Sequence, residues 1–202
     1  PYSCPMQRPS GSGWFVPARW TDEVADWIGR RAERRAATPE ERLALAERRL
    51  AAGRAKQGDE AWRTLNAMEA VAKGKERFGR YDEALPLRRE VVRLRKKQLG
   101  SDHQLTLAAE ARLAINLIEI QRPGEAKPLL VHVRDGLTAA QGPDDPTVLA
   151  VTERLADVEL ALGESEVARR LLEEEMSHLV ERGEEVSASA VAVKLATALI
   201  RD

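Results

Sequence analysis

The sequence predicts an all-α protein, a solenoid of antiparallel helix hairpins, from a regular repeat and a helix-favouring composition. Gly58, Gly100 and Gly142 follow one another at steps of 42 residues. Six alanines keep the same step in two series: Ala72, Ala114 and Ala156, then Ala84, Ala126 and Ala168. A fixed step of this length is typical of stacked hairpins, each of which buries its apolar face against its neighbours. Aromatic residues make up only 4% of the chain, while Ala, Leu, Arg and Glu dominate it, which favours helices over strands.

The first 57 residues are expected to form an arm and a cap. Residues 1–13 are rich in Pro, Gly and Ser, the composition of an extended linker. Residues 14–57 predict two capping helices or a degenerate repeat, and Thr38, Pro39 and Glu41 have the order of a helix start. Half of the aromatic residues lie near the start of this region: Trp14, Phe15, Trp20 and Trp27. They can cover the open side of the first repeat, or form an exposed docking patch.

Residues 58–186 predict three hairpins, and residues 187–202 a terminal half-repeat or capping helix. Within each hairpin, a turn at residues 79–84, 121–126 or 163–168 supplies Gly or Pro to end the first helix. Acidic residues in the same turns favour the start of the second helix, where the helix dipole is positive. Residues 99–106 and 141–147 separate successive hairpins and carry Gly, Asp and Thr for the next helix start.

Three of these strings resemble the 42-residue tetratricopeptide repeats of kinesin light chains and of many bacterial signalling proteins. They are GRYDEALPL at residues 79–87, LGSDHQLTL at residues 99–107 and GPDDPTVL at residues 142–149. The resemblance extends over residues 58–202. It implies a right-handed superhelix in which the first helix of each hairpin lines a concave groove, and a groove that binds peptide segments.

The same resemblance assigns groove positions in each repeat. They are Asn66, Glu69, Lys73, Glu76 and Arg77 in the first, Ala108, Ala111, Ile115, Ile118 and Glu119 in the second, and Ala150, Glu153, Asp157 and Leu160 in the third. The family often places Asn at successive positions of the first helix to hold a peptide backbone, and this chain does not. An apolar floor from Ile115, Ile118 and Leu160 with charged ends suits a short amphipathic or mixed-charge segment. The alternative is that Ile115 and Ile118 belong to the core.

Catalytic and metal chemistry are not expected. His103, His132 and His178 are isolated in the sequence, and Cys4 is the single cysteine, so no metal-ligand spacing can be assembled. The resemblance to tetratricopeptide repeats implies that His103 caps or packs in its loop. The carboxylates are expected on solvated helix faces, where nothing raises their pKa. The sequence therefore predicts no cofactor and no enzyme activity.

The two halves of the chain carry opposite net charges, and this pattern has more than one explanation. Residues 1–100 hold 22 Lys and Arg against 14 Asp and Glu, while the second half is acidic by nine charges. One explanation is solvated helix faces. The other is attraction between opposite charges, which would favour head-to-tail pairing between copies or capture of an acidic partner by the first half. The basic run at residues 88–97 makes nucleic-acid binding a third possibility.

We therefore predict a non-catalytic protein-interaction module that binds a protein or peptide partner. The alternative is a scaffold that self-associates, either head to tail or through the terminal helix, and nucleic-acid binding is less favoured. The chain has no apolar run of membrane-spanning length, and its single cysteine indicates the cytoplasm. Because it begins at Pro1, we expect a processed protein or a piece of a longer one.

Overall fold

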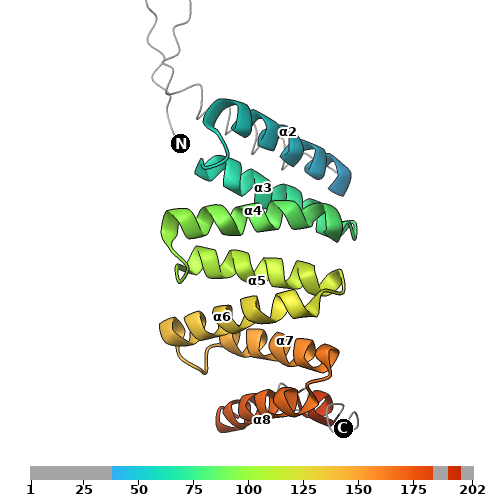
Figure 1. Cartoon of the computed structure of the whole chain (residues 1–202), viewed down its shortest axis with the longest axis vertical. Helices are drawn as coiled ribbons and strands as arrows, with labels where there is room; N and C mark the ends of the chain where they lie inside the picture. Colours follow the sequence, from blue (N-terminus) through green and yellow to red (C-terminus); the bar gives the residue numbers. More distant parts are fainter. Residues whose placement is uncertain (1–37, 184–190, 197–202) are drawn as a thin grey trace, which may run out of the picture.

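The computed structural model describes residues 38–183 and 191–196 of the chain. Its helices are α2 (Pro39–Gln57), α3 (Trp62–Arg77), α4 (Tyr81–Leu99), α5 (Gln104–Glu119), α6 (Pro123–Gln141), α7 (Pro146–Leu162) and α8 (Ser165–Glu181). Residues 191–196 are also helical. Each helix packs against the next one in the chain, and Figure 1 shows them stacked in chain order as antiparallel neighbours. The predicted all-helical solenoid is confirmed. We call α3, α5 and α7 the first helices and α4, α6 and α8 the second helices of three hairpins.

Local capping explains where several helices begin. The Thr38 hydroxyl accepts a hydrogen bond from the Glu41 backbone N–H at 3.2 Å, and the Glu41 carboxylate accepts one from the Thr38 N–H at 3.3 Å. This reciprocal pair is a capping box. His103 caps α5 by accepting from the Leu105 N–H, and Asp145 caps α7 by accepting from the Thr147 N–H. The predicted helix start at Thr38 and the capping role of His103 are thus confirmed.

The repeating glycines end the second helices in a backbone conformation that other residues rarely adopt. Gly100 has φ 89° and ψ 167°, and Gly142 has φ 91° and ψ 161°. This region of φ/ψ space is open almost only to glycine, since a Cβ atom collides with the backbone there. The 42-residue glycine step therefore records the point at which each hairpin turns toward the next.

Replacing Gly142 with Ala should lower the free energy of unfolding by about 1–3 kcal/mol, because of this backbone strain. Gly124 provides a matched control within α6: its φ is not positive, and a Cβ added there would meet no atom within 4 Å. Gly124→Ala should stabilise the protein by about 0.4–1 kcal/mol through the unfolded chain. Urea unfolding measures both variants, and equal destabilisation of the two would contradict the assignment of strain to Gly142.

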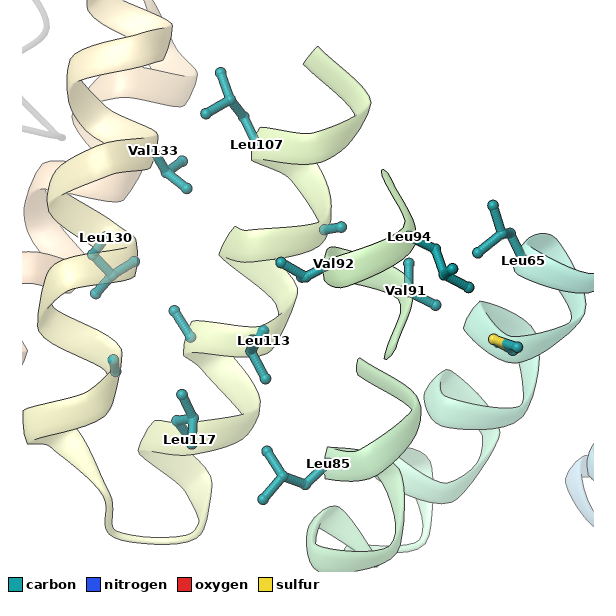
Figure 2. Packing of buried hydrophobic residues seen from close by; sticks show 14 of the residues in the cluster. Leu65, Leu85, Val91, Val92, Leu94, Leu107, Leu113, Leu117, Leu130 and Val133 are labelled. Atoms are coloured by element: carbon teal, nitrogen blue, oxygen red, sulfur yellow. The ribbon is translucent and has the colours of Figure 1, made fainter. Parts of the chain in front are cut away.

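A continuous apolar core joins the hairpins. Figure 2 shows Leu94 of α4, Leu107 and Leu117 of α5, and Leu130 of α6 directed into the space between successive helices, and each is at most 2% exposed. All six repeat alanines have no exposed surface, so a larger side chain would separate the crossing helices. At the start of the third hairpin Val148, 42 residues after the buried Thr106, takes the corresponding buried position, and Thr147 is exposed.

Several predictions fall on residues outside the described ranges. They concern the arm at residues 1–13, the aromatic cluster from Trp14 to Trp27, and most of the terminal unit at residues 187–202. The expected head-to-tail contact and the expected contact through the terminal helix depend on these segments. In the part of the chain that the structure describes, no helix is both long and apolar enough to cross a bilayer.

Candidate functional site

The first helices carry a stripe of accessible residues along one side. Its members recur at steps of three and four residues, so they lie on one face of each helix. We call this surface the first-helix face: Asn66, Ala70, Lys73 and Arg77 on α3; Ala108, Ala111, Arg112, Ile115 and Glu119 on α5; Ala150, Arg154 and Ala161 on α7. Half-buried residues border it: Glu69, Glu76, Ile118, Glu153, Asp157 and Leu160. Every predicted groove position lies on or beside this face.

The two isoleucines of the predicted floor differ in their surroundings. Ile115 is 39% exposed, so it is not a core residue. Ile118 is half-buried and packs against the core cluster. The apolar part of the first-helix face on α5 therefore consists of Ile115 with the small side chains of Ala108 and Ala111.

Two predicted groove carboxylates of α3 bind arginines of neighbouring helices. Glu76 accepts two hydrogen bonds of 2.7 Å from Arg88 of α4 and one of 3.2 Å from Asn116 of α5. Glu69 accepts from Arg95 of α4 at 2.6 Å and from Arg112 of α5 at 3.1 Å.

Both of these arginines of α4 lie in the interior. Arg88 is 4% exposed and Arg95 is 7% exposed, and a buried guanidinium needs a counter-ion. The two glutamates therefore hold α3, α4 and α5 together. The sequence analysis assigned both glutamates to the groove and missed their partners, whereas in the structure both are half-buried and paired with arginines.

A similar cluster follows at the other end of the stack. Lys194 lies 2.8 Å from Glu153 and 2.9 Å from Asp157 of α7. Burial alone would lower the pKa of Lys194, but its hydrogen bonds to these two carboxylates raise it, and the pKa is raised overall. The carboxylates of α7 on this side thus bind a cation of the chain itself.

Two cations of α3 on the first-helix face have no such partner. Lys73 and Arg77 are exposed and form no ion pair with any of the described residues. They line a cleft of about 240 Å³ between α2 and α3, together with the aliphatic side chains of Leu43, Ala46 and Ala70. The cleft therefore combines positive charge with an apolar wall.

Each cation of the basic run on α4 is neutralised by a carboxylate of the chain. Its six cations each form an ion pair with a carboxylate of the chain: Arg88 with Glu76, Arg89 with Glu125, Arg93 with Glu90, Arg95 with Glu69, Lys96 with Glu110, and Lys97 with Glu60. Hence this helix does not present an uncompensated positive surface.

The expectation that all carboxylates lie on solvated faces is wrong. Glu110 has no exposed surface, and Lys96 and His132 each approach it within 2.6 Å. The hydrogen bond to Glu110 raises the pKa of His132, although burial opposes this. Burial raises the pKa of Glu175 to about 7. Glu110 and Glu175 occupy positions that face the core, and the residues next to them in the sequence do not indicate this. No described group of three or more His, Cys, Asp or Glu residues is arranged to hold a metal ion.

A comparison with known families identifies the repeats. Residues 63–139 match the family model of the tetratricopeptide repeat. Residues 63–139 are tetratricopeptide repeats. The match spans α3 to α6, the two hairpins that carry the Glu69 and Glu76 ion pairs, and it confirms the resemblance predicted above. No curated protein sequence matches the chain.

Solved structures of tetratricopeptide-like proteins share the fold. A Podosopora anserina protein assigned as a kinesin light chain, with nearly identical TPR-like repeats, is 25% identical, and 89% of this chain aligns with 85% of that one at a TM-score of 0.74. A variant of it gives a TM-score of 0.75 at 24% identity, over 93% of this chain and 89% of that one. BtubC from P. vanneervenii is 15% identical, and 92% of this chain aligns with 90% of it at a TM-score of 0.55. The last two likenesses concern the fold alone.

Proposed function

We propose that this tetratricopeptide-repeat chain is a non-catalytic interaction module whose first-helix face binds a partner segment with acidic and aliphatic side chains. The observation that carries the proposal is the cleft between α2 and α3, where Lys73 and Arg77 lie beside Leu43 and Ala46. These two cations have no carboxylate partner within the described ranges. An acidic side chain of a partner would supply one.

Internal pairing supports an acidic partner over a basic one. Glu76 is bound by Arg88, and Glu69 is shared between Arg95 and Arg112. The carboxylates beside this part of the face are therefore already neutralised, and the charge that remains accessible on α3 is positive. Complementary charge of this kind steers association and fixes the register of a partner.

An aliphatic side chain of the partner would reach the next first helix. Ile115 is exposed on α5, and the small residues Ala111 and Ala108 precede it by four and seven residues on the same side of the helix. Burial of such a side chain contributes about 25 cal/mol per Å² of apolar surface. An extended segment that crosses from α3 to α5 would thus contact the cations Lys73 and Arg77 on α3 and then the apolar side chain of Ile115 on α5.

A protein partner is favoured over nucleic acid for a specific reason. The six cations of α4, which suggested phosphate binding, are each paired with a carboxylate. For these cations to bind phosphates and release the counterions of a nucleic acid, their pairs with carboxylates would have to break. The cytoplasmic location expected from the sequence belongs to the same proposal.

The proposal is tested by selecting ligands from a displayed library of random peptides and measuring their affinities by fluorescence anisotropy. We expect enriched peptides to carry Asp or Glu close to Leu or Ile. The double variant Lys73→Glu/Arg77→Glu should weaken their binding at least about tenfold, because it replaces attraction with like-charge repulsion.

A matched control carries two charge reversals on the second helices, Arg93→Glu and Arg170→Glu. Both arginines are exposed, so this variant alters the net charge of the chain by the same amount. It should bind the selected peptides with unchanged affinity. Equal weakening in the two double variants, or enrichment of basic peptides, would refute binding at the first-helix face.

A further inference from the structure

A second cleft, of about 500 Å³, lies between α6, α7 and α8. Its walls are partly aliphatic, with Leu149 of α7 and Leu171 of α8, and partly polar, with Thr138 of α6 and Thr152 of α7. Two acidic residues of α8, Glu174 and Glu175, complete it. None of the groove positions predicted from the sequence lines this cleft, so it is separate from the face that we propose for peptide binding.

Glu175 is the unusual group in this cleft. The residue is 4% exposed, and its Oε2 atom has no hydrogen-bond partner among the described residues. A buried carboxylate without a partner costs free energy, since it has lost its water and gained nothing in return. Glu174 beside it is exposed and forms no ion pair within the described ranges. The cleft thus has an acidic wall on α8, while its two basic lining residues, Arg134 and His178, pair with Asp135 and Asp144.

The corresponding position one repeat earlier in the stack can be compared with this cleft. Thr138, Thr152 and Glu174 stand 42 residues after Lys96, Glu110 and His132. In the earlier position, the Lys96 ammonium lies 2.6 Å from the Glu110 carboxylate, and His132 lies 2.6 Å from it on the other side. The chain therefore supplies its own ammonium at one junction. At the next junction Thr138 replaces the lysine and Thr152 replaces Glu110, while the acidic groups lie on α8, with Glu174 at the position of His132 and Glu175 at that of Val133.

We propose that the cleft between α6, α7 and α8 binds a primary ammonium group on an aliphatic stem, with Glu175 and Glu174 as its counter-ions. The ammonium would lie near the position that corresponds to Lys96 in the preceding hairpin, with the carboxylates of α8 in place of Glu110. Leu149 and Leu171 would contact the stem, as apolar walls do in sites with a few placed polar groups. A free alkylamine and a lysine side chain of a partner protein carry the same chemistry.

The charges around Glu175 set the pH dependence of this site. Burial is the main reason that its pKa is raised to about 7, and the charges of Glu153 and Asp157 raise it further while Lys194 lowers it. Groups from each neighbouring helix face the region: Arg134 and Asp135 of α6, Glu153 and Asp157 of α7, Glu174 and His178 of α8, and Lys194. An ammonium binds the ionised carboxylate, so affinity should rise as the pH increases from about 6 to about 8.

Calorimetric titration of the full chain tests the site with three probes. These are pentylamine, a short peptide with one lysine and blocked ends, and the same peptide with norleucine in place of lysine. We expect pentylamine or the lysine peptide to bind and the norleucine peptide not to bind. Binding of pentylamine alone indicates a free amine as ligand, and binding of the lysine peptide indicates a partner protein.

Two variants and one control locate the binding. Glu175→Gln removes the charge at nearly constant shape and should weaken binding at least about tenfold, the value of a charged hydrogen bond. Thr138→Lys should block the cleft with the ammonium of the chain itself and abolish binding. Glu181→Gln makes the same charge change at the exposed end of α8 and should bind as the unchanged chain does.

The proposal fails if neither amine binds at pH 8, or if Glu175→Gln binds the amines as tightly as the unchanged chain. It also fails if the affinity falls as the pH rises. None of these results depends on peptide binding at the first-helix face, so the two proposals are tested separately.

Discussion

Replacing Glu76 with alanine should lower the free energy of unfolding by about 3 kcal/mol or more. The substitution leaves Arg88, whose side chain is 5% exposed, without its bidentate partner. A buried guanidinium without a counter-ion is among the most costly defects in a protein, at about 3–5 kcal/mol when one member of such a pair is removed. Asn116 also loses one of its two hydrogen-bond acceptors. Urea unfolding followed by circular dichroism measures the effect.

The repeat itself provides the decisive comparison for Glu76. Ile118 and Leu130 stand 42 residues after Glu76 and Arg88, so the second hairpin has an apolar pair where the first has an ionic one. The double variant Glu76→Ile/Arg88→Leu should therefore be within about 1 kcal/mol of the unchanged chain, or more stable, since apolar replacements of buried ion pairs are often neutral. Glu83→Ala, which removes an exposed carboxylate shared by Arg80 and Lys75, should cost much less than Glu76→Ala. A single Glu76→Ala variant as stable as Glu83→Ala would contradict the structural role of this pair.

Replacing Leu117 with alanine should cost about 2–5 kcal/mol. Leu117 is 2% exposed and lies in the core that joins the hairpins, where Figure 2 shows it on α5 near Leu85 of α4. The lost methyl groups leave a cavity that crossing helices cannot close, which adds to the lost burial. In a stack of repeats, such a defect also weakens the contact of one hairpin with the next.

Leu105 is the control on the same helix. It is 49% exposed, so Leu105→Ala should change the stability by no more than about 0.5 kcal/mol. Urea unfolding of both variants gives the comparison, and the slope of free energy against urea should stay unchanged if folding remains two-state. Equal losses in the two variants would argue against a continuous core through α5.

The features of the fold that were predictable from the sequence are those with a local cause. Gly142 marks a φ value that only glycine tolerates, Thr38 with Glu41 forms a cap within one turn, and Ala114 allows two helices to cross closely. In each case the structural requirement falls on the same residue whose type meets it, so the requirement can be read from that residue alone. For that reason the repeat step alone gives the order and the pairing of the helices.

The ionic contacts could not be predicted in the same way. Glu69 and Arg112 are 43 residues apart, and Glu76 and Asn116 are 40 apart, so their contact depends on how whole hairpins pack. Helical periodicity places Glu69 on a face but does not tell which arginine reaches it. Glu175 lies at the position of Val91 and Val133, both core residues, 84 and 42 residues earlier. An aligned comparison of the three repeats would have indicated that this carboxylate is buried.

The most direct test of peptide binding by the first-helix face is an NMR titration of the labelled chain with a selected acidic peptide. We expect the largest amide shifts at Lys73, Arg77 and Ile115, with smaller shifts at Ala150 of α7. Shifts confined to the outer residues of the second helices, such as Arg93 and Arg170, would contradict binding at the first-helix face.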